Sequence, residues 1–185
     1  AMEGGGDPSN VGMNACAGLG PGDMHAWSRF DDMRAGGYDP AARIQEMDRD
    51  RVDAEVLYPT PRLAQGVVAT KEPDFHLALV RAYNDWLSEY TSHAPDRLIG
   101  LAFLSNRGVD GAIAELERSI ELPGIRGVLM GCYPTGTLDI EPEDDRVWAR
   151  LVELGIPLNI HVSLSDEMPK AHSRTLHGAI RFADI

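Results

Sequence analysis

The chain has 185 residues and a mass of 20.2 kDa, the size of one domain at roughly 150 residues per domain. Its 29 acidic and 17 basic residues give a formal net charge of −12, which argues against nucleic acid or anionic lipid as a partner. Hydrophobic residues make up 43% of the chain and charged residues 25%, a composition typical of globular proteins and not of disordered ones.

Two cysteines, Cys16 and Cys132, are too few for a disulfide framework, and we expect both thiols to be reduced. No apolar run approaches the ~20 residues of a membrane span. Residues 1–10 lack the basic and apolar regions of a secretory signal. These features predict a cytoplasmic protein that does not contact membranes.

The glycine-rich residues 1–38 have no regular hydrophobic period, so we expect an irregular N-terminal segment followed by one domain over 39–185. Asp39 and Pro40 are an acidic N-cap and a proline at the first helical position, and they predict a helix to about residue 50. Residues 53–60 have an apolar centre bounded by charge and by Pro59, which predicts a first strand.

Helices and strands then alternate along the chain. One apolar stripe at helical spacing predicts a helix over 72–93; it consists of Phe75, Leu79, Ala82, Tyr83, Trp86, Leu87 and Tyr90. Apolar runs predict further strands over 97–104, 125–130 and 156–162. Helical spacing predicts helices over 109–120 and 147–155, and a weak last helix over 173–183.

This order of strands, with one helix expected in each gap, requires parallel strands joined by right-handed crossovers. Two architectures fit: a doubly wound open sheet, or part of a TIM (β/α)8 barrel. A complete barrel typically has about 250 residues, so four strands in 185 residues would be about half of one.

Parallel sheets place their functional residues at the carboxyl ends of the strands. His161 lies near such an end, where a neutral imidazole can bind a metal or transfer a proton. The alternative is a core histidine with one backbone partner. We expect His76 and His93 on the helix surface, and Cys132 as an inert packed thiol. The sequence has no phosphate-binding loop and no Gly-x-Ser-x-Gly motif.

Several blocks, in order, resemble the amidohydrolase-related enzymes of the aminocarboxymuconate-semialdehyde decarboxylase type. They span residues 38–43, 47–50, 52–60, 81–86, 94–100, 112–117, 125–128 and 148–157, together with His161. The resemblance implies a (β/α)8 barrel that binds one divalent metal, often zinc, and hydrolyses or non-oxidatively decarboxylates its substrates. His161 then matches the metal-ligating histidine of the fifth strand, and the four strands are barrel strands two to five.

Three ligand motifs of that family are absent from the sequence. No His-x-His pair precedes Asp39, and the chain ends 24 residues after His161, before the sixth-strand histidine and the eighth-strand aspartate of the family. A catalytic zinc needs about three protein ligands, so one histidine cannot hold it. We therefore expect the chain to be a fragment of a longer one, completed by another chain, or a degenerate relative, and favour the first.

Two functional hypotheses remain. The first is a metal-dependent hydrolase or decarboxylase of a small carboxylic acid, with His161 as metal ligand and Tyr58, Cys132 and Tyr133 lining the substrate side. The second is a non-catalytic half-barrel that assembles with itself or with a partner through its open sheet edges. Because exposed sheet edges favour assembly, we expect a homo-oligomer, and we expect no nucleic-acid partner.

Overall fold

A computed structural model describes residues 19–20, 22–24, 29, 32–137 and 139–161. It divides into two compact units after Asp53. The first unit contains a short 3-10 helix, η3 (Ala35–Gly37), and the helix α1 (Pro40–Asp50). The domain boundary that the sequence places after residue 38 stays a prediction.

Helix α1 begins and ends as its sequence predicts. The Asp39 carboxylate accepts hydrogen bonds from the backbone N–H groups of Ala41 (2.8 Å) and Ala42 (3.4 Å), and Pro40 occupies the first helical position. The helix ends at Arg51, whose φ of 58° places it in the left-handed region and turns the chain.

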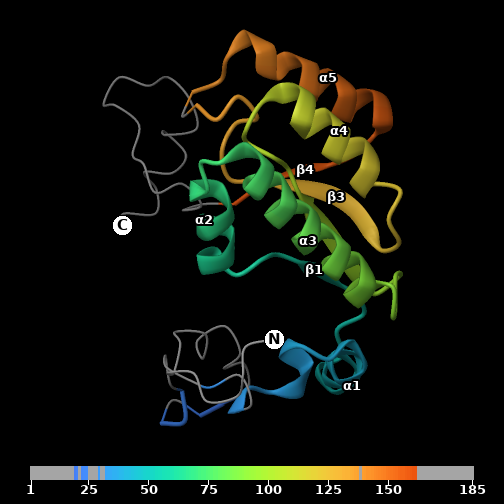
Figure 1. Cartoon of the computed structure of the whole chain (residues 1–185). Helices are drawn as coiled ribbons and strands as arrows, with labels where there is room; N and C mark the ends of the chain where they lie inside the picture. The colour runs from blue at the N-terminus through green and yellow to red at the C-terminus, as the bar shows by residue number, and fades with distance from the viewer. Residues whose placement is uncertain (1–18, 21, 25–28, 30–31, 138, 162–185) are drawn as a thin grey trace, which may run out of the picture. The chain divides into compact units, whose positions relative to one another are not determined.

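The second unit contains one parallel sheet with the order β1-β2-β3-β4. Its strands are β1 (Glu55–Leu57), β2 (Leu98–Phe103), β3 (Ile125–Met130) and β4 (Leu158–Ile160). The intervening helices are α2 (Pro61–Ala69), α3 (Pro73–Thr91), α4 (Val109–Ser119), the 3-10 helix η4 (Pro142–Asp144) and α5 (Asp145–Leu154). Helices α3, α4 and α5 follow one another side by side (Figure 1). This is the curled half-barrel of parallel βα units that the sequence predicts.

Two features of the elements differ from the prediction. The connection from β1 to β2 contains two helices, because α2 precedes the expected long helix. The signal for α2 was Pro61, a proline at a first helical position directly after the end of the strand. The outer strands β1 and β4 are three residues long, shorter than predicted. The helix predicted over 173–183 lies outside the described residues.

The buried face of α3 is more polar than its predicted stripe. Phe75 and Trp86, which the stripe assigned to the core, are 57% and 49% exposed. The residues that are buried instead include His76 and Asn84, which alternate with Val80 and Leu87 at helical spacing. A stripe built from apolar residues alone misses these positions, because the buried polar side chains here have hydrogen-bond partners.

Asn84 joins α3 to the sheet and to α4. Its amide oxygen accepts a hydrogen bond from the backbone N–H of Phe103 (2.7 Å), and its amide nitrogen donates to the carbonyl of Phe103 (3.1 Å). The same nitrogen donates to the fully buried carboxylate of Glu115 on α4 (2.9 Å). Arg81 and Arg118 pair with that carboxylate at 3.1 and 2.7 Å, so the buried charge is neutralised.

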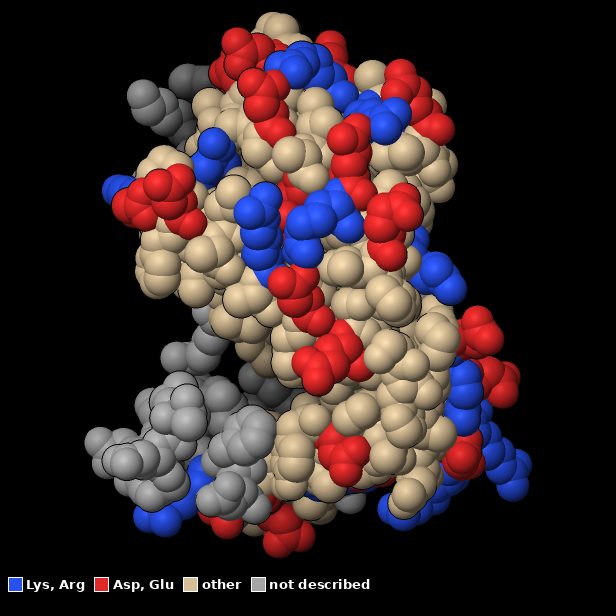
Figure 2. All heavy atoms as spheres, turned by 45° about the vertical axis from the view of Figure 1, so that its right-hand side comes forward, with Lys and Arg blue, Asp and Glu red and all other residues tan. Residues whose placement is uncertain are grey.

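Charged side chains elsewhere on the second unit are mixed in sign. The described acidic and basic residues on the face shown in Figure 2 are interspersed, without a separate basic stripe on that face. Among the helices of the described residues, none is long and apolar enough to span a membrane.

Replacing Asn84 with alanine tests the junction between α3, β2 and α4. We expect Asn84→Ala to lower the free energy of unfolding by about 2 kcal/mol or more, because it leaves the buried N–H of Phe103 and one oxygen of Glu115 without this partner. Urea denaturation measures the change. The neighbouring Asp85 is 58% exposed and pairs with Arg118, so Asp85→Ala is the control and should cost less than about 1 kcal/mol. Equal effects of the two variants would contradict this account.

Candidate functional site

The carboxyl ends of the four parallel strands form one edge of the sheet, which we call the carboxyl edge. Function in parallel α/β proteins is located at this edge. The chain presents polar side chains after each strand: Tyr58 after β1, Ser105, Asn106 and Arg107 after β2, Cys132 and Tyr133 after β3, and His161 after β4. The edge is therefore the candidate functional site.

Tyr58 and His161 come together across the carboxyl edge. The Tyr58 hydroxyl donates a hydrogen bond to the amide oxygen of Asn159 (3.0 Å), and its ring lies 5.8 Å from the His161 ring at 58°. Leu57 and Leu158 pack against the core beneath the helices, so by strand alternation their neighbours Tyr58 and Asn159 point to the opposite, concave side. Tyr58 is 47% exposed there.

The backbone around His161 is held by the neighbouring strand. The N–H of His161 donates to the carbonyl of Met130 (3.2 Å), and the amide nitrogen of Asn159 donates to the carbonyl of Val128 (3.3 Å). Both contacts reach β3, so the chain continues beside this strand one residue beyond the end of β4. The sequence-predicted position of His161, at a strand end on the carboxyl edge, is confirmed.

A metal at this edge needs more ligands than the described residues provide. These residues contain no group of three or more His, Cys, Asp or Glu side chains that could together hold an ion. A catalytic metal site keeps about three protein ligands and an open position. The described part of the chain therefore does not by itself fit a catalytic metal, and His161 is at most one ligand of such a site.

Cys132 follows β3 and is half-buried. Its thiol donates to the carbonyl of Thr137 (3.3 Å), within the loop that follows the strand. Burial raises the pKa of the Cys132 thiol, although a hydrogen bond with the Asn106 side chain opposes this shift. The thiol is protonated at neutral pH, which agrees with the expectation of an inert cysteine and not a nucleophile.

Tyr133 is 4% exposed and packs against a helix. Its ring meets the Trp148 ring of α5 edge-on, with centroids 6.5 Å apart. The following loop is tied by the buried Asp144, whose carboxylate accepts hydrogen bonds from the backbone N–H groups of Thr135 (3.0 Å) and Glu141 (2.9 Å). Tyr133 is therefore buried against α5, whereas Tyr58 is exposed.

His76 is a buried residue whose role the sequence prediction missed. It was expected on the surface but is fully buried on α3, whereas His93 is exposed as predicted. Nδ1 of His76 lies 2.9 Å from the carbonyl of Val67, and Nε2 accepts from the N–H of Asn106 (3.3 Å). These partners assign the neutral form with the proton on Nδ1. The detectable signal was the spacing of His76, four residues before Val80.

Arg107 reinforces the contact between α2 and the loop after β2. Its guanidinium donates to the carbonyls of Val68 (2.6 Å) and Thr70 (2.9 Å) at the end of α2. Together with His76, it fixes the backbone of Asn106 at the carboxyl edge. Neither residue was assigned this role from sequence, because the contact depends on the missed helix α2.

The pH dependence of stability tests the His76 contact. Burial lowers the pKa of folded His76, and Arg107 lowers it further, whereas the bond to Val67 opposes the shift. Below about pH 6.5 the unfolded chain therefore binds a proton that the folded chain does not, and stability present above that pH is lost on acidification by up to about 1.4 kcal/mol per pH unit.

We expect His76→Gln to flatten this dependence below pH 6.5, whatever its effect on stability at pH 8. Urea denaturation at a series of pH values provides the measurement. His93→Gln is the control and should keep the wild-type slope, because His93 is exposed. A wild-type slope in the His76 variant would show that His76 does not carry the effect.

Comparisons with known proteins identify the family. Residues 21–184 match the sequence model of the family described as Amidohydrolase. The chain is 32% identical over 132 residues to 2-amino-3-carboxymuconate-6-semialdehyde decarboxylase of Dictyostelium discoideum, covering 71% of this chain and 36% of that protein. It is 28% identical over 159 residues to gamma-resorcylate decarboxylase of Rhodococcus jostii, covering 80% of this chain and 46% of that protein. The chain thus spans between a third and a half of these relatives.

Solved structures give the same fold. A 5-carboxyvanillate decarboxylase from Novosphingobium aromaticivorans, with bound manganese and 3-methoxy-4-hydroxy-5-nitrobenzoic acid, is 29% identical with a TM-score of 0.54, covering 64% of this chain and 33% of that one. An amidohydrolase from Mycobacterium avium subsp. paratuberculosis, at 23% identity, superposes with a TM-score of 0.60 over 96% of this chain and 46% of that one, which supports the fold alone. The family match, which covers most of the sequence, shows that the chain belongs to the amidohydrolase family.

Proposed function

We propose that the protein is a metal-dependent enzyme that non-oxidatively decarboxylates, or else hydrolyses, a small aromatic or unsaturated carboxylic acid. The observation that carries this proposal is the meeting of Tyr58 and His161 on the concave carboxyl edge, within the region matched to the family. The names of both curated relatives support decarboxylation over hydrolysis. We further propose a cytoplasmic homo-oligomer, on the basis of composition and of β1 and β4, which each pair with one strand among the described residues.

The residues have separate proposed roles. His161 is one ligand of a divalent metal, and the other ligands come from outside the described residues. The resemblance favours zinc, whereas manganese is bound in the 5-carboxyvanillate decarboxylase structure. Tyr58 faces the substrate, and its bond to Asn159 fixes the direction of its hydroxyl. Cys132 and Tyr133 stay predicted substrate-side residues, with Cys132 contributing a protonated thiol.

Carbon dioxide release tests the proposal. The purified protein, loaded in turn with Mn²⁺ and Zn²⁺, is incubated with 2,6-dihydroxybenzoate and with 5-carboxyvanillate. We expect metal-dependent release from at least one such acid. His161→Ala should lower the rate and the bound-metal content about a hundredfold or more, since loss of an outer-shell partner alone costs 10–100-fold.

The control for this experiment is His93→Ala, which removes an exposed histidine and should leave both quantities unchanged. Unchanged metal content in the His161 variant would reject the ligand assignment. Absence of release from every acid with either metal would reject decarboxylation.

The alternative is a non-catalytic half-barrel that assembles through its sheet edges. It is supported by the lack of a three-ligand group among the described residues and by the outer strands, where Val56 and Ile160 are 51% and 48% exposed. Light scattering with metal analysis separates the two functions. The alternative predicts a stable assembly well above 20.2 kDa without bound metal, and a metal-loaded protein that releases carbon dioxide would reject it.

A further inference from the structure

Two hydrogen bonds at the carboxyl edge fix which side chain donates and which accepts. The Tyr58 hydroxyl donates to Oδ1 of Asn159 (3.0 Å), and Nδ2 of Asn159 donates to the backbone carbonyl of Val128 (3.3 Å). A carbonyl can only accept a hydrogen bond, so the amide nitrogen of Asn159 must face Val128 and its oxygen must face Tyr58. The single proton of the Tyr58 hydroxyl is therefore directed at Asn159.

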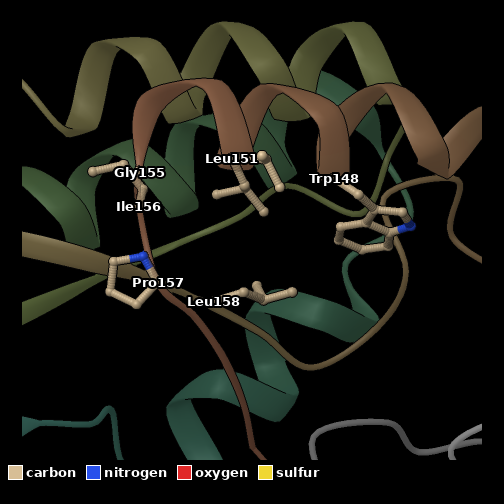
Figure 3. Close-up of a pocket in the computed structure, with 7 residues that line it drawn as sticks. Trp148, Leu151, Gly155, Ile156, Pro157 and Leu158 are labelled. Atoms are coloured by element: carbon tan, nitrogen blue, oxygen red, sulfur yellow. The ribbon is translucent and has the colours of Figure 1, made fainter.

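The alternation of side chains along β4 brings Asn159 to Tyr58. The preceding residue, Leu158, lines an apolar pocket together with Trp148 and Leu151 of α5 (Figure 3). Successive side chains of a strand point to opposite faces of the sheet, so Asn159 points away from α5. Tyr58 meets Asn159 on that side and is 47% exposed, so a ligand at the carboxyl edge can reach the Tyr58 side chain.

This arrangement leaves the Tyr58 oxygen as a hydrogen-bond acceptor. A phenol hydroxyl carries one proton, and its oxygen can still accept while that proton is donated. Turning the proton toward a ligand would take this donor from Oδ1 of Asn159, and the amide cannot rotate to compensate without losing Val128. A substrate carboxylate only accepts hydrogen bonds and does not match the Tyr58 oxygen, whereas a hydroxyl or amino group does.

We propose that Asn159 is a positioning residue that makes Tyr58 an acceptor, so that Tyr58 recognises a hydroxyl or amino group of the substrate and not its carboxylate. This assignment rests on the proposed function, in which Tyr58 faces a small carboxylic acid. The carboxylate is then bound by other groups, and Tyr58 selects among acids by the donor group that they carry. The His161 ring lies 5.8 Å from the Tyr58 ring, so the selected group lies on the His161 side of the carboxyl edge.

Equilibrium dialysis of the purified full chain with Mn²⁺ tests the proposal by binding alone. The donor probes are 3- and 4-aminobenzoate, and the acceptor probes are 3- and 4-cyanobenzoate, which carry the same carboxylate. We expect the amino acid of at least one pair to bind about tenfold more tightly than its cyano partner. Tyr58→Phe removes the accepting oxygen and should abolish this preference, while the affinity for unsubstituted benzoate stays within about twofold.

Two variants of Asn159 separate positioning from structural support. Asn159→Asp keeps an oxygen that accepts from Tyr58, so the preference for the amino probe should persist even if both affinities fall. Asn159→Leu has no acceptor, so the Tyr58 proton becomes available to the cyano probe and the preference should fall at least about threefold. A purely structural role of Asn159 would weaken the binding of both probes equally.

The outcomes distinguish this assignment from the proposed function. Binding of the acids without a preference, or a preference that survives Tyr58→Phe, would overturn the role of Tyr58 and leave metal-dependent release of carbon dioxide as a separate result. An equal preference in Asn159→Asp and Asn159→Leu would overturn the role of Asn159. Binding of none of these acids would overturn the assignment, and absence of carbon dioxide release as well would reject the proposed function.

Discussion

The structure depends on one constraint: a parallel sheet of four strands must curl if the side chains at its two outer edges are to meet. The Tyr58 hydroxyl and the Asn159 amide, 101 positions apart in the chain and on opposite outer strands, are joined at 3.0 Å. Their bond lies on the concave side, at the edge where all four strands end. The curl therefore turns four separate strand ends into one surface, with His161 beside Tyr58.

Helix α3 supports this surface from the convex side through polar contacts. Asn84 pairs with both backbone groups of Phe103 at the end of β2, and His76 accepts from the N–H of Asn106 three residues later. Both side chains are fully buried, so each lost contact leaves a backbone group unpaired away from water. Polar residues on one helix thus fix the path of the chain at the carboxyl edge, while apolar packing of Val80 and Leu87 supplies bulk stability.

Sequence patterns predicted the parts of the fold that depend on local periodicity. The four strands, their parallel arrangement and the helices α1, α3, α4 and α5 were all indicated by apolar spacing, caps and prolines. The helix α2 was missed because Pro59 and Thr60 were interpreted only as a strand end. Apolar spacing alone assigns Phe75 and Trp86 to the core, whereas the buried face of α3 also contains polar side chains with hydrogen-bond partners.

Only part of the candidate site could be predicted from the sequence. Position at a strand end was enough to select His161 and Tyr58, but their contact depends on the curl of the sheet, which no local pattern encodes. The roles of His76 and Arg107 depend on α2, and were not predictable without it. The remaining metal ligands could not be derived, because the described residues contain no group that would complete a site with His161.

We propose that this half-barrel is part of a catalytic metal-binding protein. The number of strands that carry metal ligands decides between this function and the non-catalytic half-barrel. The intact mass of the protein isolated from the cells that naturally produce it tests this claim most directly. We expect a mass well above 20.2 kDa, because the chain spans only 36% and 46% of the two curated relatives. A mass of 20.2 kDa would contradict catalysis by this chain alone, and would favour the assembling half-barrel.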